Sequence, residues 1–510
     1  MGPRPPTPGG AGALMAARGV AAIAVESPDR LALVVGDRRI TYAELDAEAN
    51  RWARWLAGAG VGHGERVAVM LSNRPEVFAV WYGAARAGVQ IVPVSYRFTA
   101  AEVEYLVADS EAAAFVYEDP ALAGPAAAGR GVRAAVAVDD PGVAGLPADP
   151  PGEGFIGSPP VFMNYTSGTT GRPKGIVRPL PQPAREMPPQ PFADFWGFRR
   201  DDVHLLCGPA YHTAPGNYAV MHLNEGAPVV VMERFGGEEC LALIERERVT
   251  TSHMVPANFV RILEADWPRF DRSSVRKILH AAAPCPVAVK RRIMEVFGEE
   301  AVWEYFGMSE GFATTISPGE WLAKPGSVGK PFPGVSIRIL GEDGRELGPG
   351  EVGTIYVSSL PGHRFSYYKA PEKTERAWRE EYFTVGDLGH LDEDGYLFIA
   401  DRRVDLIISG GVNIYPAEVE QALAEHPDVV DSAVFGLPDD RWGQRVHALV
   451  ELRPGSARDE AGLLDFLSGR LAGFKLPRQI EFVDELPREP SGKVLKRQLR
   501  DERLAKGGPR

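Results

Sequence analysis

Residues 165–175 read Tyr-Thr-Ser-Gly-Thr-Thr-Gly-Arg-Pro-Lys-Gly, a run of glycines and hydroxyl side chains that closes on a lysine and a glycine. Glycine lets a backbone approach an anion closely, and successive N–H groups can form a concave anion site. The run differs from the GxxxxGK[ST] loop because glycine follows the lysine. We predict that it holds a triphosphate, with a plain surface loop as the alternative. The expected contacts are Thr166, Ser167, Gly168, Thr169, Thr170, Gly171 and Lys174.

Around this run, apolar residues alternate between helical and strand spacing. Residues 43–59 show helical spacing and residues 66–71 strand spacing, and similar pairs continue to about residue 400. Such alternation predicts an α/β fold with mostly parallel strands. Short strands with glycine turns from residue 335 predict a β-rich subdomain. We expect a large N-terminal domain of two α/β sheets plus this β-rich part, and a small mobile α+β C-terminal domain. The predicted bounds are 1–13 for a disordered tail, 14–402 and 403–510.

Charge and composition limit the classes of partner. The net charge is −12 over 510 residues, without the basic footprint of a dedicated nucleic-acid binder. The three cysteines lie far apart, which favours neither a disulfide framework nor a zinc ribbon. No apolar run approaches the roughly 18 residues that a membrane span needs. These features predict a cytoplasmic monomer or homodimer that binds small molecules, with no nucleic acid and no membrane span.

Five further segments complete a recognisable series. Residues 40–45 read ITYAEL, 305–310 YFGMSE, 383–387 FTVGD and 490–493 PSGK, and DRRVD at 401–405 precedes ISGG at 408–411. Together with residues 165–175, they resemble the signatures of the adenylate-forming superfamily: acyl-CoA synthetases, peptide-synthetase adenylation domains and luciferases. The resemblance spans about residues 40–500 and favours the acyl-CoA synthetase branch, close to fatty-acid–CoA ligases. It implies a ligase that uses ATP, Mg²⁺ and coenzyme A to convert a carboxylic acid, through an acyl-adenylate, to a thioester.

The resemblance also assigns roles within the adenylation site. Glu310 would hold Mg²⁺, although a glutamate is more often a solvated surface residue. Asp387 would accept hydrogen bonds from both ribose hydroxyls, with a turn aspartate as the alternative. Lys493 would stabilise the charge that develops during adenylation, and the alternative is one more lysine in a basic tail. The remaining nucleotide contacts would be Ala282, Ala283, Phe306 against adenine, Gly307, Ser309 at the α-phosphate and Arg402.

Other residues would serve the acid and the thiol. His212 would line the acyl site, although a lone histidine is usually structural. The other expected acyl contacts are mostly small or apolar: Asn217, Val255, Ala257, Ala281, Gly307 and Met308. No aspartate stands among them to capture an α-amino group, which argues against an amino acid as substrate. Coenzyme A would use Gly410, Gly411, Trp442 and Lys475 or Arg478, although the tryptophan with its basic neighbours is equally typical of ordinary packing. The domains would rotate about Val404.

Two departures from the family pattern leave alternatives open. Val385 stands where the TGD motif carries threonine, and Val404 stands where the hinge is usually polar. Adenylation could therefore be weakened, with the acyl-adenylate supplied by a partner enzyme of a biosynthetic pathway. A ligase that loads a carrier protein and a non-catalytic adenylate-binding protein are further alternatives, and a luciferase-type activity is improbable. The identity of the acid cannot be predicted from these residues.

Overall fold

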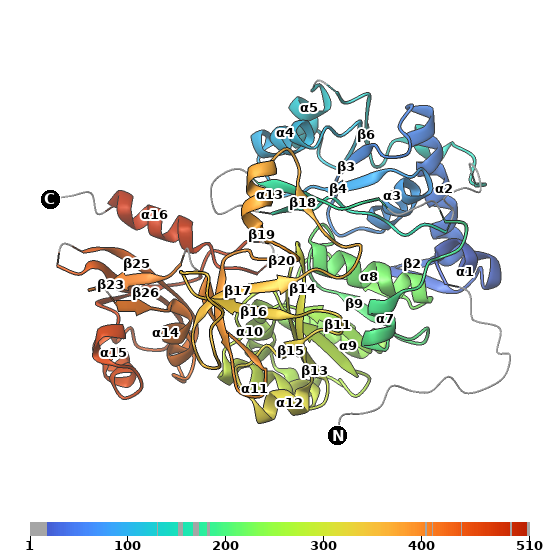
Figure 1. Cartoon of the computed structure of the whole chain (residues 1–510). Helices are drawn as coiled ribbons and strands as arrows, with labels where there is room; N and C mark the ends of the chain where they lie inside the picture. The colour runs from blue at the N-terminus through green and yellow to red at the C-terminus, as the bar shows by residue number, and fades with distance from the viewer. Residues whose placement is uncertain are drawn as a thin grey trace.

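The computed structural model describes residues 18–129, 131–150, 157–166, 173–180, 184–402, 405–410, 412–439, 441–489 and 492–506. A large N-terminal domain and a small C-terminal domain are evident, the latter drawn in orange and red at one side of the molecule (Figure 1). The predicted α/β class with two unequal domains is thus confirmed. The predicted tail over residues 1–13 lies outside the described residues. The exact domain boundary stays a prediction, since residues 403 and 404 also lie outside them.

The largest sheet positions most of the N-terminal domain. In the described residues it has nine strands, of which β13, β12, β11, β9, β10 and β1 are parallel neighbours and the flanking pairs are antiparallel. The spatial order is β15 (Lys330–Pro331), β14 (Gly311–Ile316), β13 (Val302–Met308), β12 (Lys277–His280), β11 (Thr251–Met254), β9 (His204–Leu206), β10 (Val229–Val231), β1 (Leu31–Val35) and β2 (Arg38–Thr41). Its helices are α7 (Pro191–Trp196), α8 (Thr213–Glu225), α9 (Gly237–Glu247), α10 (Pro256–Glu264), α11 (Val287–Phe297) and α12 (Pro318–Ala323).

A second, smaller sheet is entirely parallel. Its order is β4 (Gln90–Pro93), β3 (Arg66–Met70), β5 (Ala114–Tyr117) and β6 (Ala134–Ala137). The associated helices are α1 (Val20–Glu26), α2 (Tyr42–Gly58), α3 (Pro75–Arg86), α4 (Ala100–Asp109), α5 (Pro120–Ala127) and α6 (Pro141–Ala144). One apolar core joins both sheets, because Leu33 and Val229 of the large sheet cluster with Val67 and Ile91 of the small one. Sequence reasoning expected only one strand in residues 119–159, and it missed the short helices α5 and α6.

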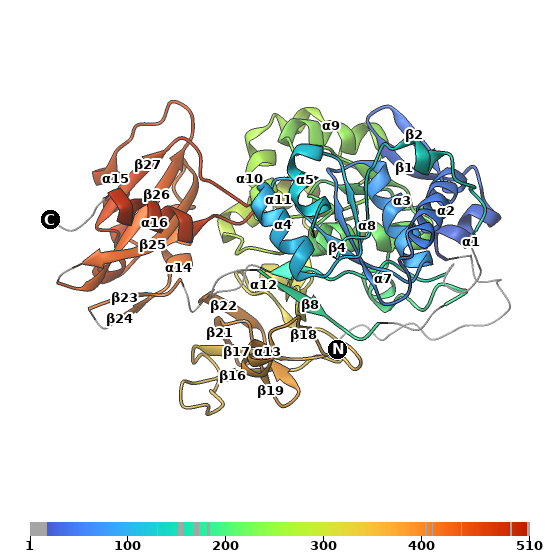
Figure 2. The ribbon, with the colours of Figure 1, turned by 90° about the horizontal axis from the view of Figure 1, so that it is seen from above.

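The predicted β-rich subdomain is also present. An antiparallel sheet contains β19 (Trp378–Arg379), β20 (Tyr382–Phe383), β17 (Gly353–Ser358), β21 (Asp387–Leu391) and β22 (Leu397–Arg402), with β16 (Ile337–Leu340) paired to β17. Helix α13 (Pro371–Ala377) accompanies it, as Figure 2 shows. A three-stranded sheet lies alongside: β18 (Ser366–Tyr367), β8 (Lys174–Val177) and β7 (Tyr165–Thr166). Residues 161–165 read as a strand that precedes the triphosphate segment, but the structure has only β7 and one parallel bridge between Phe162 and Ile91 there.

The C-terminal domain forms a separate body in Figure 2. Its three-stranded sheet runs β25 (Val429–Asp439), β26 (Gly443–Leu452), β27 (Gln479–Val483), and a hairpin pairs β23 (Ile407–Ser409) with β24 (Val412–Ile414). Helices α14 (Pro416–Leu423), α15 (Glu460–Ser468) and α16 (Lys496–Lys506) complete it. Ile407, Val419, Val450 and Leu467 belong to its own apolar core, so this domain does not depend on the larger core for its packing.

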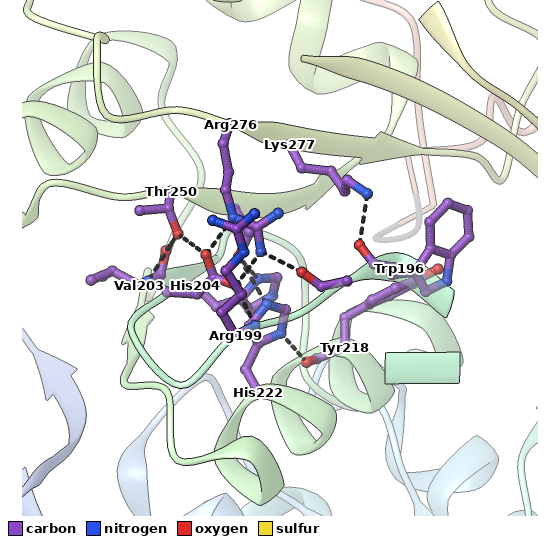
Figure 3. Close-up of polar contacts among 12 residues, drawn as sticks. Trp196, Arg199, Val203, His204, Tyr218, His222, Thr250, Arg276 and Lys277 are labelled. Atoms are coloured by element: carbon purple, nitrogen blue, oxygen red, sulfur yellow. Dashed lines mark hydrogen bonds and ion pairs between the residues drawn. The ribbon is translucent and has the colours of Figure 1, made fainter. Parts of the chain in front are cut away.

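A buried polar chain fixes helix α8 against the large sheet. The Nδ1 of His222 donates to the Tyr218 carbonyl at 2.7 Å, so Nε2 accepts from the Thr251 hydroxyl at 2.9 Å. The Thr251 oxygen lies 3.1 Å from Nδ1 of His204, whose ring stacks on His222 at 4.0 Å (Figure 3). Burial lowers the pKa of both rings, to about 4 for His222, and both are neutral near pH 7. The chain therefore holds one face of α8 in a fixed orientation.

Candidate functional site

A cavity of about 1490 Å³ lies where the two domains meet. Its walls include helix α8, the ends of β11 and β12, the β13–β14 turn and, from the C-terminal domain, residues 485–489 and 492–493. Among the predicted site residues that line the cavity, His212 and Lys493 are 281 positions apart in the sequence. Eleven of the predicted site residues line it: His212, Asn217, Val255, Ala257, Ala281, Ala282, Gly307, Met308, Ser309, Glu310 and Lys493.

His212 stands at the N-terminal end of α8, as the residue before its first turn. Its ring lies 4.6 Å from that of Tyr211, and its Nε2 is buried with no hydrogen-bond partner among the described residues. Burial, followed by the positive charges of Lys493 and Arg97, lowers the pKa of His212 to about 4. The imidazole is therefore neutral at physiological pH, and it places a free ring nitrogen beside the lysine.

The β13–β14 turn presents Ser309 and Glu310 to the cavity. The Ser309 hydroxyl lies 3.1 Å from that of Thr213, the first residue of α8. Arg178 donates to the backbone carbonyls of Ser309 and Glu310, at 2.7 and 2.8 Å. Because these contacts come from two other elements, the turn is held rigidly at the start of α8. Sequence reasoning predicted Ser309 and Glu310 but missed Arg178, which belongs to no motif.

Glu310 is only 6% exposed, and the Tyr367 hydroxyl donates to its Oε1 at 2.8 Å. Burial and the Glu310 charge raise the pKa of Tyr367, which keeps this hydroxyl protonated as a donor. Among the described residues, no hydrogen bond to the second carboxylate oxygen, Oε2, accompanies this one. One carboxylate at the edge of an open cavity suits a hard cation that takes its other ligands from phosphate and water. The residues present therefore fit Mg²⁺ that arrives with a nucleotide.

Two of the predicted triphosphate contacts lie in the described residues. Thr166 and Lys174 stand directly opposite each other on the antiparallel strands β7 and β8. The Lys174 ammonium is 3.7 Å from Oδ1 of Asp109, whose other oxygen accepts from the Tyr165 hydroxyl at 2.9 Å. Asp109, which sequence reasoning missed, thus orients both flanks of the segment. The other five predicted contacts, Ser167, Gly168, Thr169, Thr170 and Gly171, lie outside the described residues.

The remaining nucleotide residues lie near the cavity walls or behind them. Asp387 is buried, and its backbone is in register with that of Arg402 across β21 and β22; the ribose role of the two residues stays a prediction. Phe306 is half-buried against the apolar core of the β-rich subdomain. Ala282 has a φ of +78°, a strained value for a residue other than glycine. Among the described residues, the cavity lining includes Ala282 but not Ala283, Phe306, Asp387 or Lys174.

The C-terminal domain reaches the cavity through the segment that carries Lys493. Gly492 has a φ of +84°, and a Cβ atom there would lie 2.7 Å from Cγ2 of Val255. Nearby, Arg261 contacts Glu485 at 2.8 Å and Glu451 at 3.7 Å across the domain boundary. These contacts lie beside the segment that carries Lys493, whose charge acts on His212.

The predicted coenzyme A residues lie elsewhere. Gly410 donates its N–H to the Trp442 carbonyl at 2.7 Å, and Trp442 is 38% exposed. Lys475 pairs with Glu418 at 2.5 Å. In the described part of the chain, none of Gly410, Trp442, Lys475 and Arg478 lines the cavity. Their assignment stays a prediction, and Gly411 and the hinge residue Val404 lie outside the described residues.

Comparison with known proteins gives a consistent result across the chain. The AMP-binding enzyme family matches residues 20–362, and the AMP-binding enzyme C-terminal domain matches residues 418–493. ScoC of Streptomyces coeruleorubidus, a fatty acid–[acyl-carrier-protein] ligase, is 34% identical over 94% of both chains. A 2-succinylbenzoate–CoA ligase of Geobacillus kaustophilus is 35% identical over 93% of this chain and 95% of the relative.

The fold has close counterparts among solved structures. ATP-bound MatB from Rhodopseudomonas palustris superposes with a TM-score of 0.80 and 32% identity, over 94% of this chain and 96% of that one. A search of the described helices for one that is long and apolar enough to cross a bilayer finds none.

Proposed function

Because this chain belongs to the AMP-binding enzyme family, we propose that it makes an acyl-CoA in two steps that share the cavity between its domains. It is an acid–thiol ligase of the acyl-CoA synthetase branch of adenylate-forming enzymes. The observation that carries the two-step proposal is the meeting of Lys493, His212, Ser309 and Glu310 in one cavity, although they come from both domains.

In the first step, a carboxylate oxygen of the acid attacks the α-phosphorus of ATP. The bond from that phosphorus to the bridging β-phosphate oxygen breaks, and pyrophosphate leaves with the electron pair. Lys493 would stabilise the charge on the attacking and α-phosphate oxygens, which is electrostatic preorganisation. His212 is neutral, so it adds a hydrogen-bonding ring nitrogen without repelling the lysine. Ser309, held by Thr213, is placed to donate to the α-phosphate.

Mg²⁺ would be held by Glu310 and would neutralise charge on the transferring phosphate oxygens. The protein's own part is to keep that carboxylate fixed. Tyr367 binds one of its oxygens, and Arg178 holds the backbone on which it stands.

In the second step, the sulfur of coenzyme A attacks the acyl carbon, the carbon–oxygen bond to AMP breaks, and the thiol proton passes to solvent. Gly410, Trp442, Lys475 and Arg478 are remote from the cavity in this arrangement. A role for them requires the C-terminal domain to rotate, a hinge movement that we place at Val404. The present arrangement, with Lys493 inside, then corresponds to the adenylating one.

Gly492→Ala tests whether the backbone position of Lys493 matters for the first step. The new Cβ atom would clash with Cγ2 of Val255. In addition, the positive φ at position 492 is a backbone conformation that alanine disfavours. We expect pyrophosphate release to fall by about 10-fold or more, because small misplacements of a reacting group are costly. Gly469→Ala is the matched control, since its Cβ would meet only ordinary contacts, at 3.7 Å. A rate within two-fold of the parent enzyme would contradict the proposed importance of this position.

The proposed function is tested by a screen of carboxylic acids with ATP and Mg²⁺. Pyrophosphate release and coenzyme A consumption are measured in parallel. Equal rates of pyrophosphate release and of coenzyme A consumption support both half-reactions in this chain. Coenzyme A consumption only when an acyl-adenylate is supplied would favour the weakened-adenylation alternative suggested by Val385 and Val404. No consumption with any acid or adenylate would overturn the proposal.

A carrier-protein thiol is the second candidate acceptor. It is favoured by one observation: the relative ScoC is named as a ligase for an acyl carrier protein. The screen therefore includes a phosphopantetheinylated carrier protein beside free coenzyme A. Thioester formation on the carrier alone would assign this second function.

A further inference from the structure

One stripe of the cavity wall along helix α8 is polar. At 100° per residue, positions 213, 217, 220 and 224 fall within about 60° of one another, so they form one stripe along the helix. All four line the cavity, as Thr213, Asn217, Val220 and Asn224. Three of the four carry hydrogen-bonding side chains. A binding site for a plain alkyl chain would have apolar residues here.

Asn224 is the most telling member of the stripe. It is 1% exposed, and its Oδ1 accepts from the Tyr82 hydroxyl at 2.8 Å. Its Nδ2 is buried and has no hydrogen-bond partner among the described residues. A buried amide donor without a partner is unfavourable, by an amount comparable to a lost hydrogen bond. Asn224 is itself a cavity-lining residue, so these unpaired N–H groups lie at the wall of the space that a substrate would fill.

The helix cannot easily turn this group away. His222 lies about 180° around α8 from Thr213, on the opposite side from the stripe. It is fixed there by its bonds to Thr251 and to the Tyr218 carbonyl, the second of which is seen in Figure 3. The backbone N–H of Gly19 also donates to the Asn224 carbonyl at 2.7 Å. The amide is therefore held in place before any ligand binds.

A second polar group stands in the same part of the cavity. His253 lines the cavity, and its ring stacks on that of Tyr218 at 5.0 Å. Its Nε2 lies 2.9 Å from the Tyr305 hydroxyl, whereas its Nδ1 is buried with no partner in the described ranges. Burial lowers the pKa of His253 to about 3, so the ring is uncharged. His253 and Tyr218 thus offer the cavity a neutral hydrogen-bonding group and aromatic faces.

From these contacts we infer that the acyl pocket selects acids with an uncharged oxygen acceptor far from the carboxylate, which Asn224 Nδ2 binds. This inference rests on the proposed function and names its substrate class. The rise of α8 from Thr213 to Asn224 is about 16 Å, so the acceptor lies about a dozen carbon–carbon bonds of about 1.5 Å from the reacting end. Ketone, ester and ether oxygens meet this requirement, and saturated fatty acids do not.

The test uses straight-chain acids in which a ketone or ether oxygen replaces one methylene at successive positions. Each acid is assayed for thioester formation and, separately, for binding by calorimetry without ATP or coenzyme A. We expect one distal position to be preferred over the plain acid by about 10- to 100-fold in kcat/KM and in Kd. Conversion of all acids with no positional preference would overturn the inference and leave the proposed function intact. Conversion of none would contradict the proposed function, while binding still decides the inference.

Two variants assign the preference to the residue. Asn224→Leu should abolish it and improve conversion of the plain acid, because the unpaired donor is removed. Adding Val220→Asn to Asn224→Leu should restore a preference for an acceptor about 6 Å nearer the carboxylate, one turn of helix away. Thermal unfolding checks that each variant is folded. If Asn224→Leu does not fold, Val220→Asn alone should still create the nearer preference. A preference that neither variant changes would show that another group binds the oxygen.

Discussion

Replacing Lys493 by alanine is expected to slow pyrophosphate release by about 100- to 1,000-fold, the usual cost of losing one preorganised stabilising group. The lysine is the charged residue that the C-terminal domain brings to His212, in the cavity that also contains Ser309 and Glu310. Its charge would act while oxygen–phosphorus bonds form and break. The same variant should make thioester from a supplied acyl-adenylate at nearly the parent rate, because the residues that we propose to bind coenzyme A do not include Lys493.

The two half-reactions are therefore assayed separately on one preparation. Arg497→Ala is the control, because Arg497 is a neighbouring basic residue whose side chain is 72% exposed. It should leave both rates within about two-fold of the parent. An equal loss of both half-reactions in the Lys493 variant would refute the alternating role of the C-terminal domain.

Acidification from pH 7.5 to pH 5 is expected to destabilise the protein severely. The folded state lowers the pKa of four buried histidines, His204, His222, His253 and His280, chiefly through burial. Between the folded value and the unfolded value near 6.5, the unfolded chain binds more protons, so the free energy of unfolding falls with falling pH. At pH 5, each histidine that stays neutral in the folded state lowers the free energy of unfolding by about 2 kcal/mol. Four such losses approach the whole stability of an ordinary domain.

Thermal unfolding measured at several pH values between 7.5 and 5 checks this expectation. The decline should begin near pH 6.5, well above the range in which carboxylates are protonated. His253→Gln should flatten the decline relative to the parent, whereas His63→Asn, at an exposed position, should not change it. A midpoint that stays constant down to pH 5 would contradict the expectation.

Much of the fold could be predicted because it depends on local patterns. The alternation of helical and strand spacing predicted α2 through β4 to within a residue or two at most ends. Ser309 and Glu310 were predicted together because they belong to one continuous motif, and the structure places both at the cavity. The predicted strand before the triphosphate segment was largely wrong: apolar spacing at residues 161–165 led to one bridge and a short hairpin.

Residues that act through distant contacts could not be predicted. Asp109 meets Lys174, and Tyr367 meets Glu310, across separations of 65 and 57 residues, and neither pair follows a spacing rule. Asn217 was predicted as an acyl contact, but Asn224 was not. Periodicity places both on one stripe of a helix, yet it does not say which stripe faces a cavity. That information comes from the His222–Thr251 contact on the other side of α8.

The ion pair between Arg261 and Glu485 joins the two domains but contributes little to holding them in one arrangement. The two side chains are 41% and 74% exposed, and an ion pair so open to water is worth about 1 kcal/mol or less. Dissolved salt screens it further. In the proposed two-arrangement cycle, an ion pair this weak would leave the substrate in the cavity to decide which arrangement the C-terminal domain adopts.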